Sequence, residues 1–231
     1  IDFAIQLNLE NLGQCRFRGN AFFQKSGPSV VLRSIPRNIP SLAELGLPVD
    51  IGQGLMEWHQ GLVLVTGPTG AGKTSTLAAL TDYANSTRPQ NIITLEDPIE
   101  FVHRPKKSLV VQRQVGMHTD SYASALRAAL REDPDIILVG ELRDEETISL
   151  SMTAAETGHL VISTMNTISA AQTINHLVHG GVVETTSVVH IEQIEHPGVG
   201  DAVAQRIERG HGGFRQVDGK ARNPAGIPIQ H

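Results

Sequence analysis

Apolar and polar side chains alternate along roughly the first 35 residues, as at Phe3, Ile5 and Leu7. A period of two is typical of β-strands that bury one face, and Gly13 supplies a turn signal between two such stretches. The pattern predicts a small β-rich piece made of antiparallel strands. Because the alternation is already under way at Ile1, we expect the chain to be a fragment that begins inside a strand.

Three prolines, Pro36, Pro40 and Pro48, interrupt this alternation and mark a connector. Within the connector, the sequence Ser-Leu-Ala-Glu at residues 41–44 has the form of a capping box, which predicts a short helix that opens there. We therefore place a domain boundary near residue 50, with a partial N-terminal domain and its linker over residues 1–50.

From Gly61 onward, short apolar runs alternate with amphipathic stretches. The apolar runs predict buried parallel strands at 62–65, 92–95, 136–139 and 159–163. The amphipathic stretches predict helices at 73–84, 121–131 and 145–157. This alternation indicates an α/β domain with a predominantly parallel sheet over residues 51–231. Beyond about residue 180 the pattern weakens, with partial helical periodicity over 185–194 and 201–207.

Composition and charge narrow the class of protein. Among 231 residues, 19 Lys and Arg stand against 24 Asp and Glu, which gives a formal net charge of −5, and 4% of the residues are aromatic. A nucleic-acid binder needs a positive field and stacking surfaces, so we expect no nucleic-acid partner. The single cysteine, Cys15, excludes an intrachain disulfide framework and favours a reducing compartment. No apolar run approaches the roughly 18 residues that span a bilayer, so we expect a protein that is neither exported nor membrane-spanning.

A glycine-rich loop follows the apolar run at 62–65 and matches the pattern G-x-x-x-x-G-K-[ST]. Its backbone N–H groups and the start of the next helix can cradle a polyphosphate, and Lys73 can reach the β- and γ-phosphates. The Thr74 hydroxyl is the candidate ligand for Mg²⁺. The predicted nucleotide-binding residues of this segment are Gly67, Pro68, Thr69, Gly70, Ala71, Gly72, Lys73, Thr74 and Ser75.

Carboxylates that directly follow the predicted strands form the second group of candidate site residues. In a parallel sheet the ligand lies at the carboxyl ends of the strands. Glu96 and Glu141 follow their strands and are therefore candidates for contact with the ligand, whereas Asp135 precedes its strand and is not. Hydrolysis of a nucleoside triphosphate needs a group that orients or deprotonates water, and electrostatic support on the metal side. We assign Glu96 to the water and Glu141 to the Mg²⁺ shell, although the two roles could be exchanged.

Together these motifs resemble the secretion ATPases of type II and type IV systems, and most closely the PilT-type retraction ATPases of type IV pili. The resemblance is dense over residues 16–178 and includes the family's Walker A, Asp-box and Walker B motifs. The segments that carry it are 16–22, 32–36, 44–48, 61–80, 93–101, 124–144 and 153–160.

The resemblance implies a hexameric, RecA-like P-loop motor ATPase with a PAS-like N-terminal domain and catalytic sites between subunits. It also implies a location at the cytoplasmic face of the inner membrane, peripheral to it, next to a pilus platform protein. Lys73 and Thr74 become the Walker A pair, Glu96 the Asp-box glutamate and Glu141 the Walker B glutamate. The arginines that could complete the site are Arg18, Arg33, Arg131 and Arg143.

The chain departs from the family pattern in three respects, one of which is that its N-terminal domain is incomplete. Asn166 stands where the family has the histidine of its His box, and an amide can bind phosphate but carries no titratable proton. After about residue 180 the match is faint, and the chain ends before the family's C-terminal helices. Besides an active motor, we therefore consider a catalytically weakened ring subunit with a regulatory or structural role. A DNA-translocating motor is a third hypothesis, against which the acidic charge counts.

Overall fold

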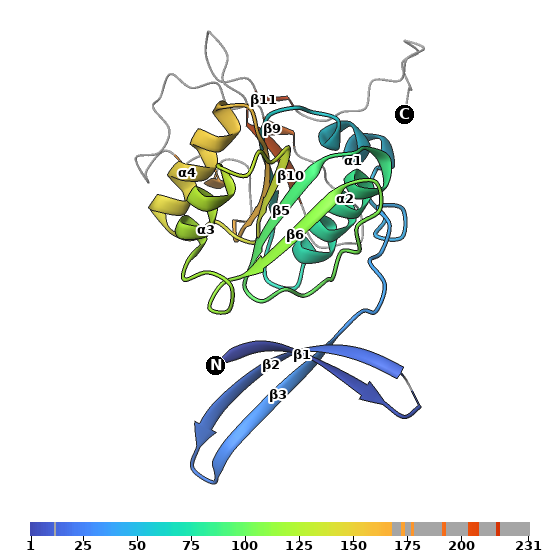
Figure 1. The fold of residues 1–231 in the computed structure, drawn as a ribbon, viewed down its shortest axis with the longest axis vertical. Helices are drawn as coiled ribbons and strands as arrows, with labels where there is room; N and C mark the ends of the chain where they lie inside the picture. The colour runs from blue at the N-terminus through green and yellow to red at the C-terminus, as the bar shows by residue number, and fades with distance from the viewer. Residues whose placement is uncertain are drawn as a thin grey trace, which may run out of the picture.

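The structure is a computed structural model that describes residues 1–11, 13–167, 172–173, 177, 191–192, 203–207 and 216–217. It consists of an antiparallel three-stranded sheet joined by a connector to a layered α/β unit (Figure 1). Among the described residues, no helix combines the length and the apolar character needed to cross a membrane.

The N-terminal sheet has the strand order β1-β2-β3. Its strands are β1 (Asp2–Leu9), β2 (Gly13–Gln24) and β3 (Gly27–Ile35), and each pairs antiparallel with its neighbour in sequence. Both connections use glycine at positive φ, +66° at Gly13 and +116° at Gly27, a conformation that other residues rarely adopt. The antiparallel β-rich piece predicted from the alternating pattern is confirmed.

The connector forms the predicted capping box without the predicted helix. The Ser41 backbone N–H and hydroxyl donate to Glu44 Oε2 at 2.7 and 2.8 Å, and the Glu44 N–H donates to Ser41 Oγ at 3.2 Å. The prediction of a helix there is nevertheless wrong, because residues 42–46 form turns. Gly46 lies at φ +72°, and Pro48 disfavours helical geometry in the residue before it. The first helix, α1 (Val49–Met56), begins only after Pro48.

The α/β unit contains a six-stranded sheet with the order β10-β4-β8-β7-β5-β6. Five of its strands are parallel, which confirms the predominantly parallel, RecA-like sheet: β4 (Gly61–Thr66), β5 (Asn91–Glu96), β6 (Leu109–Gln114), β7 (Ile136–Val139) and β8 (Leu160–Met165). The sequence pattern does not reveal β6, because this edge strand carries only three apolar residues in LVVQRQ.

Helices cover both faces of this sheet (Figure 1). The helices are α2 (Lys73–Thr87), α3 (Tyr122–Ala129) and α4 (Glu145–Glu156), besides α1. Successive side chains of β4 enter opposite cores: Leu62 and Leu64 pack with α3 and α4, whereas Val63 and Val65 pack with α1 and α2. All four side chains are at most 1% exposed, so both faces of the sheet are sealed from water at β4.

Two segments beyond residue 180 are strands where the periodicity favours helix. The strand β10 (Val203–Ile207) pairs antiparallel with β4, so the helical expectation for 201–207 is wrong. The physical reason is that the edge of β4 offers unpaired backbone groups, which local periodicity does not report. Within 185–194, the structure describes only β9 (Ile191–Glu192), which pairs with β11 (Gln216–Val217); the remainder of that prediction lies outside the described residues.

Candidate functional site

The carboxyl ends of the parallel strands open on one cavity of about 390 Å³, which the N-terminal sheet also borders. The cavity brings together most of the site residues predicted from the sequence. Those that line it are Arg18, Arg33, Thr69, Gly70, Gly72, Lys73, Thr74, Ser75, Glu96, Glu141, Arg143 and Asn166.

The glycine-rich loop joins β4 to α2 in the strand–loop–helix arrangement that its motif requires. Gly70 and Gly72 lie at φ +86° and +89°, so the loop depends on glycine at both positions. Gly72 is the N-cap of α2 and supplies no side-chain cap, which leaves N–H groups of the first helical turn for an outside acceptor. Such an N-terminus suits a phosphate group, because its N–H groups and the helix dipole both favour negative charge.

Lys73 is folded back onto its own loop. Its ammonium group donates to the carbonyl oxygens of Gly67 and Pro68 at 2.8 and 2.9 Å. Burial lowers the pKa of this ammonium group, and the negative charge of Glu141 opposes that effect. The remaining predicted loop residues, Gly67, Pro68 and Ala71, are not among those that line the cavity, and the Ala71 N–H donates to Pro68 O at 3.2 Å.

Glu96 is the last residue of β5, and its carboxylate is held by two side chains. Glu96 Oε1 accepts hydrogen bonds from Thr94 Oγ1 at 2.7 Å and from Gln112 Nε2 at 3.0 Å. Burial raises the pKa of this carboxyl group, and the two hydrogen bonds oppose the rise because they stabilise the charged form. A carboxylate whose pKa is raised in a cleft is a candidate for proton chemistry.

Asp135 and Glu141 lie at opposite ends of β7, as the strand-end argument predicts. Asp135 Oδ2 accepts from the backbone N–H of Asn91 at 2.7 Å, at the point where β5 begins. Glu141 follows the end of β7 and forms an ion pair with Arg143, whose Nε lies 2.7 Å from Glu141 Oε2. This contact raises the pKa of Arg143, although 73% of the arginine side chain is exposed.

The four candidate arginines fall in different places. Arg18 and Arg33 are cross-strand partners on β2 and β3, so one patch of the N-terminal sheet carries both into the cavity. Arg18 Nη1 also lies 3.0 Å from Glu100 Oε1. Arg131 is not among the residues that line the cavity: it follows the far end of α3, roughly 13 Å from Tyr122 at 1.5 Å per residue.

Tyr122 and Gln112 are among the residues at the site that were not assigned to it from the sequence. Tyr122 fits the apolar stripe of its helix and packs against the core, yet it also lines the cavity, and burial raises the pKa of its hydroxyl group. Gln112 carries no motif and contacts Glu96 from the neighbouring strand. Tyr122 opens α3 and adjoins no strand end, and Gln112 lies on β6, which was not predicted, so no sequence signal pointed to either residue.

A divalent cation would find few protein ligands here. Among the described residues, no group of three or more His, Cys, Asp or Glu side chains could hold a metal ion. Thr74 and Glu141 nevertheless both line the cavity, and a hydroxyl with a carboxylate is the oxygen donor set that Mg²⁺ accepts when phosphates and water complete its shell. The residues present therefore fit Mg²⁺ bound together with a nucleotide.

Comparison with known proteins identifies the family of this chain. A family model described as type II/IV secretion system protein matches residues 2–222. The chain belongs to this family. Among its relatives, a twitching motility protein of Neisseria gonorrhoeae is 54% identical over 178 residues, which are 77% of this chain and 46% of that protein. The type IV pilus retraction ATPase PilT of Pseudomonas aeruginosa is 56% identical over 166 residues, 72% of this chain and 48% of that protein.

The family fold is also evident from a solved structure, that of the pilus retraction motor PilT with bound ADP. It superposes on this secretion-family chain with a TM-score of 0.73 at 41% sequence identity, over 91% of this chain and 64% of the other. This chain spans about half the length of the two curated relatives named above.

Gly140 tests how closely the site is packed. A Cβ added there would lie 3.0 Å from Tyr122 Oη and 3.3 Å from the Leu95 carbonyl oxygen. We expect Gly140→Ala to lower the free energy of unfolding by about 1–3 kcal/mol through overpacking, measured by urea denaturation. The control is Gly54→Ala in α1, where nothing lies within 4 Å and where alanine should stabilise the helix by about 0.5–1 kcal/mol. Equal effects of the two changes would contradict close packing at Gly140.

Proposed function

We propose that this chain binds Mg·ATP and hydrolyses its γ-phosphate as the motor portion of a homohexameric ring that powers type IV pilus retraction or a related secretion step. The observation that carries the proposal is the shared cavity, on which the glycine-rich loop, Glu96 and Glu141 all open. The names of the relatives support the assignment to pilus retraction and twitching motility.

The residues of the site divide into those that would bind the nucleotide and those that would take part in its hydrolysis. The N–H groups at the start of α2 would hold the phosphates, and Lys73 would exchange its two carbonyl acceptors for phosphate oxygens. Glu96 would orient the attacking water and accept its proton, because its carboxylate lines the cavity and partial burial raises its pKa. Mg²⁺ held by Thr74 and Glu141 would neutralise negative charge on the phosphates.

Arginines from the N-terminal sheet supply the positive charge that the transferring phosphoryl group needs. Arg18 and Arg33 already border the cavity, and Arg143 lies beside Glu141. Arg131 would contribute only across a subunit boundary, since it lies outside the cavity of its own chain. We propose a division into an N-terminal unit over 1–50 and an ATPase unit over 51–231, in a ring at the cytoplasmic face of the inner membrane against the platform protein.

Lys73 should dominate nucleotide affinity. We expect Lys73→Ala to weaken Mg·ATP binding about 10- to 100-fold, because the loss of a charge-assisted hydrogen bond costs roughly 1.5–3 kcal/mol. Isothermal titration measures this, with Lys107→Ala as the control. Lys107 donates to Thr87 O at the far end of α2, away from the loop. An unchanged affinity of Lys73→Ala for Mg·ATP would contradict the assignment of the phosphate site.

The two glutamates should separate binding from chemistry. Glu96→Gln and Glu141→Gln keep the shape of each side chain and remove its negative charge, so we expect retained ATP binding and a kcat lowered on the order of 100-fold or more. Steady-state hydrolysis assays measure the loss. Asp135→Asn, at the opposite end of β7, is the control and should leave kcat close to that of the unmodified chain. A reversed order of effects would contradict the strand-end assignment.

A catalytically weakened ring subunit is the second candidate function, and Asn166 favours it. This exposed amide follows β8, lines the cavity and offers no titratable group near neutral pH. If turnover is limited there, Asn166→His should raise kcat several-fold with little change in KM, and the gain should vary with pH near the ordinary imidazole pKa of about 6.5. Rates are measured from pH 5.5 to 8.5 beside a sizing experiment. Identical hydrolysis rates across this pH range, with both proteins assembled as hexamers, would contradict the hypothesis that Asn166 limits turnover.

A further inference from the structure

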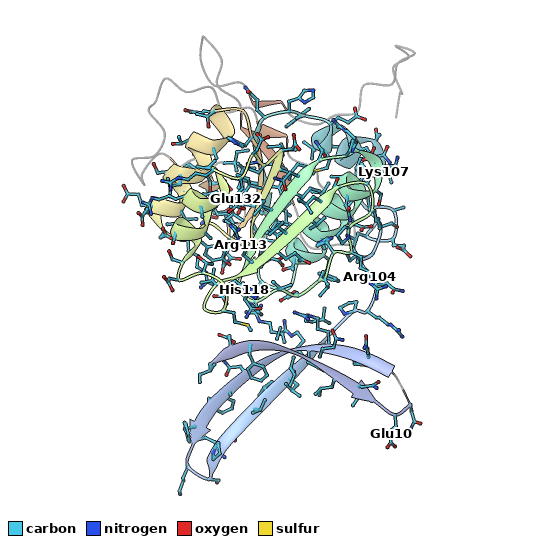
Figure 2. All side chains as sticks on the ribbon, in the orientation of Figure 1. Glu10, Arg104, Lys107, Arg113, His118 and Glu132 are labelled. Atoms are coloured by element: carbon cyan, nitrogen blue, oxygen red, sulfur yellow. The ribbon has the colours of Figure 1, made fainter. Side chains whose placement is uncertain are left out.

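Two glutamines of the edge strand β6 face the segment that follows Glu96, and one of them also contacts Glu96. Gln112 and Gln114 are two residues apart, so they project from the same face of the strand. Arg113 projects from the other face, where Figure 2 shows it beside Glu132, with which it forms an ion pair of 2.8 Å. Both glutamines therefore hold this segment, and only Gln112 also contacts Glu96.

Gln112 uses its whole amide group. Its Nε2 donates to Glu96 Oε1 at 3.0 Å and to the Phe101 carbonyl oxygen at 2.9 Å, and its Oε1 accepts from the His103 N–H at 2.8 Å. An amide NH₂ has two hydrogens, and both have an acceptor here. One side chain thus ties the Glu96 carboxylate to the backbone of the loop 97–103.

The same loop carries the contacts to the N-terminal sheet. Arg16 on β2 donates through Nη2 and Nε to the Ile99 carbonyl oxygen at 2.7 and 3.3 Å, and Arg18 pairs with Glu100 at 3.0 Å. On the opposite side of the loop, the Ile99 N–H donates to Gln114 Oε1 at 3.2 Å. The loop therefore lies between β2 and β6, and both glutamines hold it.

We propose that Gln112 is a positioning residue that holds the Glu96 carboxylate in its orientation toward the cavity and connects it to the loop on which the N-terminal sheet docks. The catalytic consequence of this contact rests on the proposed function. Gln114 anchors the same loop without touching Glu96, so the pair separates anchoring of the loop from positioning of the carboxylate.

The charged and hydrogen-bonding groups around Glu96 determine in which direction its pKa moves when Gln112 is replaced. Burial raises the pKa of Glu96 and the hydrogen bonds from Thr94 and Gln112 lower it, while Glu100 raises it and Arg16 lowers it. Loss of the Gln112 donor must therefore raise this pKa further. The other titratable or charged groups that face Glu96 or share its cavity are Arg18, Arg33, Lys73, Asp97, His103, Tyr122, Glu141 and Arg143.

The first test compares Gln112→Met with Gln114→Met in the full chain. Gln112→Met loses two bonds to the loop and Gln114→Met loses one, but only Gln112→Met also loses the bond to Glu96. We expect Gln112→Met to lower kcat about 10- to 100-fold with little change in the KM for ATP. The acidic limb of its pH profile should move to higher pH, because Glu96 must be deprotonated to act. Gln114→Met should keep the kcat and the acidic limb of the unmodified chain; equal losses in the two variants would overturn the proposal.

Gln112→Glu is the second variant. It keeps an oxygen acceptor for the His103 N–H and lacks the amide donor to Glu96, so its kcat should be at least as low as that of Gln112→Met. A rate restored by Gln112→Glu would show that anchoring of the loop suffices, and it would also overturn the proposal.

The second test does not depend on turnover. Carboxyl ¹³C NMR of glutamate-labelled protein follows the titration of Glu96, and the signal is identified by its absence in Glu96→Gln. The midpoint should move to higher pH in Gln112→Met and stay in place in Gln114→Met; an unmoved midpoint in both would refute the positioning role. If the unmodified chain fails to hydrolyse ATP, the proposed function fails, while this titration still decides the role of Gln112.

Discussion

Burial of both faces of the parallel sheet is the constraint on which the rest of this structure depends. Residues of β4 alternate between two apolar cores, and both cores are closed to water by helices. On the fully buried strands β4, β7 and β8, polar groups can then meet solvent only where the strand ends. The glycine-rich loop, Glu96 and Glu141 each follow the carboxyl end of a strand, so a single edge of the sheet collects them in one cavity.

The loop 97–103 connects that edge to the N-terminal sheet. It leaves β5 directly after Glu96, contacts Gln112 and Gln114 on one side, and accepts Arg16 and Arg18 on the other. A movement of the N-terminal sheet would therefore act first on this loop and then on the carboxylate. These contacts include hydrogen bonds and an ion pair, and hydrogen bonds of this kind exchange partners at low net cost.

Three of the cationic side chains at the cavity bind acceptors of the protein itself. Lys73 donates to carbonyl oxygens of its own loop, Arg143 pairs with Glu141, and Arg18 pairs with Glu100. A polyphosphate that recruits these cations has to displace those acceptors. Binding of nucleotide and rearrangement of the surrounding segments would then share the same contacts.

The sequence by itself determined the features whose physics is local. The phosphate loop is a contiguous motif between a strand and a helix, and Glu96, Glu141 and Asp135 could be sorted because each adjoins a buried apolar run. The antiparallel N-terminal strands followed from a period of two. The capping box at Ser41 was also recognised, although Gly46 and Pro48 end the turn before a helix forms.

Only the tertiary structure decided the features that depend on segments far apart in the chain. The strand β6, the pairing of β10 with β4, and the contact between Gln112 and Glu96 all rest on backbone or side-chain partners that no local pattern specifies. Arg18 entered the cavity and Arg131 did not, because sheet register and helix length determine where each arginine lies. Hydrophobic periodicity records which face of an element is buried, whereas the identity of the polar partner is settled only when the elements pack together.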